Sequence, residues 1–125
     1  MHLPPVLIVE DDTDSRNMLA ALLGLHGYRT VTAANGLEAL EEARRERPMV
    51  ILLDLMMPVM DGQTFRREQL ADATLAAIPI VVLSAHAQTA QLARELGAAA
   101  HLMKPFDLER LLQAIRAAEN GVGAA

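Results

Sequence analysis

The sequence predicts an α/β domain with a doubly wound parallel sheet built from five strand–helix units. Short apolar runs lie at 6–9, 50–53 and 80–83, with a weaker one at 100–103. Unbroken runs of this length are typical of strands in a parallel sheet, because helices bury both of its faces. Between the runs, apolar residues recur with the period of a helix. Strands that alternate with helices in this way favour right-handed βαβ units within one sheet.

The first half of the chain supplies two of these units. After the run at 6–9, an apolar stripe predicts a helix, and we expect this stripe to face the core: Met18, Leu19, Leu22, Leu23 and Leu25. The more polar segment 28–33, with Val31 at its centre, predicts an edge strand. Asn35 and Glu38 have the spacing of a capping box, so we expect the second helix to begin there.

The second half supplies the other three helices. The third is expected to begin near Gly62, the fourth to end at Gly97, and the fifth to begin after Asp107 as its N-cap. The residues that mark these helices are Phe65, Gln69 and Leu70 in the third, Leu92, Ala93 and Leu96 in the fourth, and Leu108, Leu111, Leu112 and Ile115 in the fifth.

Length and composition limit the class of protein. The 125 residues predict one domain over 1–120, followed by a flexible tail or the start of a linker at 121–125. The absence of cysteine excludes a disulfide scaffold and a thiolate metal site. A net charge of -5 argues against a nucleic-acid-binding face. The chain starts without a signal-peptide pattern and contains no run long enough to span a membrane, so we expect a cytoplasmic protein.

Polar side chains follow four of the five strands. Ligands of open α/β sheets bind beyond the carboxyl ends of the strands, so these side chains are expected to line one crevice. They are Glu10, Asp11 and Asp12 after the first strand, Asp54 after the third, Ser84 after the fourth and Lys104 after the fifth.

The carboxylates among these residues indicate a site for a hard cation. Two like charges about 4 Å apart repel by roughly 4 kcal/mol at an effective dielectric constant near 20. A divalent cation removes this conflict, and Mg²⁺ prefers carboxylates, water and phosphate oxygens. Helix capping by Asp12 or Asp14 is the alternative explanation. It does not account for Asp54, which directly follows a buried run.

Asp54 and Lys104 together suggest phosphoryl chemistry. A carboxylate beside Mg²⁺ can attack a phosphoryl group to form an aspartyl phosphate. Lys104 is the only lysine among eleven basic residues, and its compact charge suits a phosphoryl oxygen. A solvated surface lysine remains the alternative. Ser84 could donate its hydroxyl to such an oxygen, although serine is common at strand ends.

These residues resemble the receiver domains of two-component response regulators, the chemotaxis-regulator-like (CheY-like) branch of the flavodoxin-like folds. The resemblance extends from Val6 to about Ala118. The motifs that carry it are Val-Glu-Asp-Asp at 9–12, Asp-Leu-Met-Met-Pro-Val-Met-Asp-Gly at 54–62, Leu-Ser-Ala at 83–85 and Lys-Pro-Phe at 104–106. The resemblance implies a strand order of 2-1-3-4-5 and a cis peptide bond between Lys104 and Pro105.

The resemblance also implies a role for each site residue. Asp54 corresponds to the phosphoacceptor, which a histidine kinase or a histidine phosphotransfer protein phosphorylates. Glu10 and Asp11, with Asp54 and the backbone carbonyl of Met56, correspond to the Mg²⁺ ligands.

Ser84 corresponds to the switch hydroxyl and Lys104 to the lysine that pairs with the phosphoryl group. The expected output is a shift in the fourth and fifth strand–helix units, read by an output protein or effector domain. At the position where the family usually has a switch tyrosine or phenylalanine, this chain has His101. We hypothesise that this titratable ring makes the switch sensitive to pH.

Three other functions fit the sequence less well. An Asp-nucleophile phosphatase usually has a second acid two residues after the nucleophile, where this chain has Met56. A nucleotide or flavin module is disfavoured because neither a G-x-G-x-x-G motif nor a P-loop occurs. A degenerate receiver that acts only through protein contacts is disfavoured by the complete residue set. We therefore expect a signalling switch rather than an enzyme.

Overall fold

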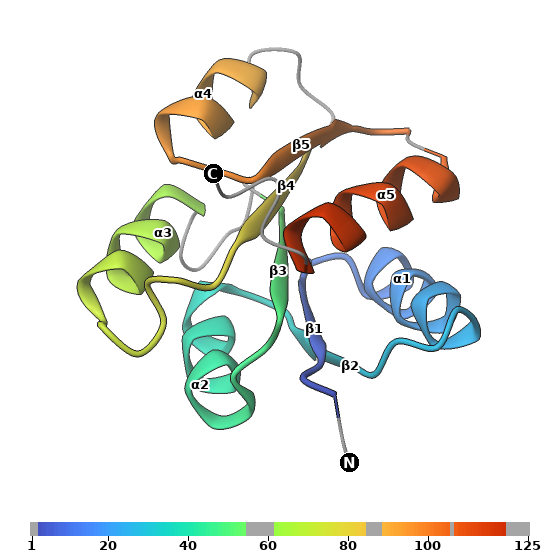
Figure 1. Cartoon of the computed structure of the whole chain (residues 1–125), viewed down its shortest axis with the longest axis horizontal. Coiled ribbons are helices and arrows are strands. Elements are labelled where there is room, and N and C mark those ends of the chain that lie inside the picture. Colours follow the sequence, from blue (N-terminus) through green and yellow to red (C-terminus); the bar gives the residue numbers. More distant parts are fainter. Residues whose placement is uncertain (1–2, 55–61, 85–88, 106, 120–125) are drawn as a thin grey trace.

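The computed structural model is a five-stranded parallel sheet with helices on both faces (Figure 1). It describes residues 3–54, 62–84, 89–105 and 107–119. The elements in chain order are β1 (Val6–Val9), α1 (Thr13–Leu25), β2 (Thr30–Ala33), α2 (Gly36–Glu46), β3 (Val50–Asp54), α3 (Gly62–Ala71), β4 (Ile80–Ser84), α4 (Thr89–Glu95), β5 (Ala100–Met103) and α5 (Leu108–Glu119). The strand order β2-β1-β3-β4-β5 confirms the predicted fold class.

The two faces of the sheet carry separate cores. Helices α1 and α5 cover one face and α2, α3 and α4 cover the other (Figure 1). Along β1 the side chains alternate between them: Val6 and Ile8 join the core under α1 and α5, while Leu7 and Val9 join the opposite core. All four are buried, which explains why the strand runs are unbroken rather than alternating.

The predicted helix ends agree with the hydrogen bonds. The side chain of Asn35 accepts from the amide of Glu38 at 2.9 Å, and Glu38 accepts in turn from the amide of Ala34 at 2.9 Å. Asp107 accepts from the amide of Arg110 at 2.8 Å before α5. Gly97 has the positive φ of 72° that a chain leaving a helix often needs.

Three expectations about the elements were wrong in detail. The second strand begins at Thr30, because the amide of Tyr28 closes the end of α1 by donating to Leu23. Asp54 and Ser84 are the last residues of β3 and β4 rather than the first residues beyond them.

The predicted stripe of α1 is only partly buried. Leu19 and Leu23 belong to the core, whereas Met18 and Leu25 lie on a side of the helix that faces outward. Leu70 of α3 is also exposed. None of the helices in the described part of the chain is long and apolar enough to cross a membrane. The predicted tail at 121–125 lies outside the described residues.

Candidate functional site

The four strand ends that carry polar residues lie side by side in the sheet. Glu10 directly follows β1, and Lys104 directly follows β5. Between them, Asp54 pairs with Leu83 across β3 and β4, and the amide of Lys104 donates to the carbonyl of Ser84 at 2.7 Å. Parallel strands place all of their carboxyl ends at one edge, so residues far apart in sequence gather there.

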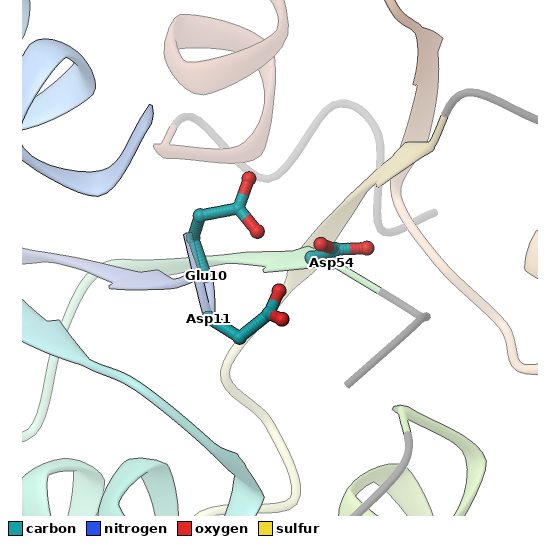
Figure 2. Close-up of side chains that lie close together, drawn as sticks. All are labelled: Glu10, Asp11 and Asp54. Carbon is teal, nitrogen blue, oxygen red and sulfur yellow. The ribbon is translucent and has the colours of Figure 1, made fainter. Parts of the chain in front are cut away.

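Three carboxyl groups form the centre of this site. Oxygen atoms of Glu10, Asp11 and Asp54 all lie within 4.8 Å of one another. Figure 2 shows the three carboxyl groups directed toward a common space. Glu10 and Asp54 are buried, with 3% and 7% of their surface exposed, while Asp11 is exposed. The pair of buried acids makes this a place where negative charge is costly without a cation.

Lys104 supplies one positive charge to this group. Its Nζ lies 2.8 Å from Oε1 of Glu10 and 3.9 Å from Oδ2 of Asp54. The sequence predicted that this lysine would serve a phosphoryl group near Asp54. In the structure its shorter contact is to Glu10, because these two residues follow the ends of β1 and β5 and both side chains extend toward the end of β3 between them.

The pKa values of Glu10 and Lys104 both depend on this contact. Burial raises the pKa of the Glu10 carboxyl, and a hydrogen bond with Asp54 raises it further, while Lys104 offsets part of the effect. Burial acts against the charged form of Lys104, but the hydrogen bond to Glu10 and the charges of Glu10 and Asp54 outweigh it and raise the pKa of the ammonium. One cation beside three acids leaves negative charge at the site.

The donor set fits Mg²⁺. Hard divalent cations prefer oxygen ligands, and three carboxylates from two adjacent strand ends offer them without histidine or cysteine. Asp12, the neighbouring acid, has a different role: it accepts from the amide of Ser15 at 2.8 Å and caps α1, and these hydrogen bonds lower its pKa. Met56, the fourth predicted ligand, lies outside the described residues.

Sequence reasoning missed one residue that shapes the site. Nη1 of Arg16 donates to the backbone carbonyl of Glu10 at 2.8 Å and to that of Asp11 at 3.4 Å. These contacts hold the segment that carries two of the three carboxylates. No local signal predicted them, because an arginine on the first turns of a helix usually points into solvent.

His101 lies in the middle of β5, next to Val82 of β4. It is half-buried, and its Nε2 is a buried nitrogen with no hydrogen-bond partner in the described part of the chain. Ala100 and Leu102 pack toward α5, so the alternation of a strand directs His101 to the opposite face. Ser84 shares that face, because Ile80 and Val82 of β4 belong to the same core. The predicted hydroxyl and ring therefore lie on one side of the sheet.

Comparisons with known proteins identify the family of this chain. A family model described as the response regulator receiver domain matches residues 6–116. Sporulation initiation phosphotransferase F of Bacillus subtilis is 36% identical over 114 residues, which cover 89% of this chain and 90% of that protein. The chain therefore belongs to the response regulator receiver domain family.

Solved structures agree with this assignment. Chemotaxis protein CheY4 of Vibrio cholerae superposes with a TM-score of 0.84 at 34% identity, covering 92% of this chain and 98% of that one. The receiver domain of a sensor histidine kinase from Pseudomonas aeruginosa, solved with a magnesium ion coordinated in its active-site cleft, has a TM-score of 0.85 at 32% identity. That match covers 95% of this chain and 99% of the other.

Proposed function

We propose that this domain is a phosphorylation-dependent switch in which Asp54 accepts a phosphoryl group. The observation that carries the proposal is the buried carboxylate of Asp54, which ends β3 among two further acids and one lysine. Its relatives support the proposal, because a protein named as a phosphotransferase is similar along nearly the whole chain. The histidine kinase or histidine phosphotransfer protein expected from the sequence is the proposed donor.

Glu10, Asp11 and Asp54 would hold Mg²⁺, with the backbone carbonyl of Met56 as a further predicted ligand. A receiver domain of similar structure was solved with magnesium in its cleft, which supports this assignment. The bound cation would neutralise the crowded carboxylates and the charge of the incoming phosphoryl oxygens.

The phosphoryl transfer forms one bond and breaks one bond. A carboxylate oxygen of Asp54 forms a bond to phosphorus while the P–N bond to the donor imidazole breaks, and the electron pair leaves with the imidazole, which takes up a proton. Lys104, whose Nζ is 3.9 Å from Asp54, is close enough to donate to an oxygen of the transferred group. Because only 7% of the Asp54 surface is exposed, bulk water would have limited access to the acyl phosphate.

The output is a change in conformation rather than turnover of a substrate. We propose that the hydroxyl of Ser84 moves toward the phosphoryl group. The ring of His101, on the same face of the sheet, then moves into the space that this hydroxyl vacates. Ser84 ends β4 and His101 lies in β5, within the fourth and fifth strand–helix units that are expected to present the signal to a partner. The chain thus acts as a switch whose only reactions are its own phosphorylation and dephosphorylation.

Intact-mass spectrometry after incubation with acetyl phosphate and Mg²⁺ tests this proposal. We expect a single phosphoryl adduct in the wild type, none in Asp54→Asn, and none without Mg²⁺. Asp14→Asn is the matched control, because Asp14 is an exposed acid on the first turn of α1, outside the carboxylate group. It should accept the phosphoryl group like the wild type.

Absence of the adduct would contradict the proposal unless hydrolysis outpaces the measurement. Beryllofluoride, which mimics a bound phosphoryl group, distinguishes these cases. A rise in melting temperature with beryllofluoride and Mg²⁺ that needs Asp54 indicates an acceptor with a short-lived phosphoryl group. No rise would identify a receiver that works only through protein contacts.

A further inference from the structure

Arg66 of α3 is a buried cation that lies away from the carboxylate site. Only 8% of its surface is exposed. No carboxylate lies within ion-pair distance of it in the described residues, and burial lowers its pKa. Arginine is seldom buried without a charged partner, because desolvation of the guanidinium is costly. The contacts that replace a carboxylate therefore indicate what this side chain does.

The guanidinium binds the C-terminal end of α4. Nε donates to the carbonyl of Leu96 at 2.9 Å, and Nη2 donates to the carbonyl of Gly97 at 3.3 Å. Helix α4 ends at Glu95, so these two carbonyls belong to the turn that leaves the helix. Carbonyls at a helix C-terminus lack partners within the helix and carry partial negative charge, which favours a cation there. Arg66 thus caps α4 from a different helix.

A second buried side chain fixes the orientation of Arg66. Nη1 of Arg66 donates to Oε1 of Gln69 at 2.8 Å, one turn along α3. Gln69 has no exposed surface, and its Nε2 donates to the carbonyls of Leu75 at 3.0 Å and Ile78 at 2.9 Å. The two side chains form a continuous polar bridge from the segment before β4, through α3, to the end of α4.

Helix α4 depends on such outside contacts for its position. It has seven residues, and a helix this short is unstable without tertiary contacts. Ala93 is its one fully buried apolar side chain within the described residues, with Leu92 only partly buried. The polar bridge from α3 therefore adds to the apolar packing of Leu92, Leu96 and Ala98 in holding the C-terminal end of α4 in place.

We propose that Arg66 is a positioning residue that ties the C-terminal end of α4 to α3, so that α4 pivots about this end when Asp54 is phosphorylated. The tie itself follows from the contacts above. The pivot rests on the proposed function, since it concerns the change that phosphorylation produces.

Amide hydrogen exchange followed by NMR tests the tie in the unphosphorylated protein. The informative amides are those of Leu96, Gly97 and Ala98, which donate within α4 and its closing turn. Loss of hydrogen bonds from a charged donor is expected to speed their exchange about tenfold or more in Arg66→Met, while the amides of β3 keep their wild-type rates. Arg44→Met is the control, because it removes an arginine that pairs with Asp72 at the surface.

The variant Arg66→Gln guards against a misfolded Arg66→Met protein. Glutamine is neutral and keeps one donor near the carbonyls, so we expect a smaller acceleration confined to the same three amides. Wild-type exchange at residues 96–98 in both Arg66→Met and Arg66→Gln would overturn the proposal. Acceleration of the same size in β3 would also overturn it, since it would show a general loss of stability.

Beryllofluoride with Mg²⁺ then tests the pivot. In the wild type, backbone amide chemical shifts should change at residues 90–92 and stay constant at 96–98, whereas in Arg66→Met the change should reach 96–98. Equal changes at both ends of α4 in the wild type would overturn the pivot. If beryllofluoride gives no rise in melting temperature even in the wild type, the proposed function fails. The exchange rates of wild type and Arg66→Met without beryllofluoride would still decide whether Arg66 holds α4.

Discussion

Removal of the Lys104 ammonium from the carboxylate site should destabilise the protein in a way that depends on pH. The change is Lys104→Met, which keeps most of the aliphatic stem and deletes the ammonium. In the wild type, Nζ lies 2.8 Å from Glu10 and 3.9 Å from Asp54, and both acids are buried. The variant leaves two buried carboxylates without this counter-charge.

Two limits bound the size of the effect. At an effective dielectric constant of about 20, the two attractions amount to about 6 and 4 kcal/mol, and desolvation of the charges offsets much of this. A carboxylate can also escape by binding a proton. From its ordinary pKa of 4.5, protonation of Glu10 at pH 7 costs about 3.4 kcal/mol, and at pH 5 only about 0.7 kcal/mol.

We therefore expect Lys104→Met to lower the free energy of unfolding by about 2–3 kcal/mol at pH 7 and by less than about 1 kcal/mol at pH 5. Because the chain has no tryptophan, urea unfolding is followed by circular dichroism. Arg29→Met, which breaks an exposed ion pair with Glu46, is the control and should cost no more than about 1 kcal/mol at either pH. A loss for Lys104→Met that is equally large at pH 5 and pH 7 would refute the reasoning.

Three further predictions follow from single side chains. Because the pKa of Glu10 is raised, the metal-free protein should lose stability as the pH rises from 4.5 through that raised value. For the same reason, Mg²⁺ binding measured by calorimetry should weaken as the pH falls. The variant Glu10→Gln should flatten both pH profiles. His101→Phe should raise the free energy of unfolding by about 1 kcal/mol, because it removes a buried nitrogen without a partner in the described chain, and urea titration would show no gain if Nε2 is in fact satisfied. Arg47 has a φ of 50°, so Arg47→Gly should raise the stability by about 1 kcal/mol; an unchanged melting temperature would argue against backbone strain there.

Patterns within short stretches of sequence were enough for the fold class and for most of the residues at the site, while the strand order was an implication of the family resemblance. Unbroken runs such as 50–53 mark strands covered on both faces, and Asn35 with Glu38 marks a helix start, because the apolar pattern of a buried strand and the spacing of a helix cap can each be read from a few consecutive residues. The parallel sheet then places Glu10, Asp54 and Lys104 at one edge, since every strand end points the same way.

The partners of individual side chains were decided only by the tertiary structure. The contact of Lys104 with Glu10 joins residues 94 positions apart, and its length depends on how far two strand ends are separated across the sheet. The roles of Arg16 and Arg66 also depend on which backbone carbonyls neighbouring segments bring within reach. An arginine on a helix has the same local pattern whether it meets water or a carbonyl. The sequence by itself therefore determined which residues gather at the site, and the packing of distant segments determined which of them touch.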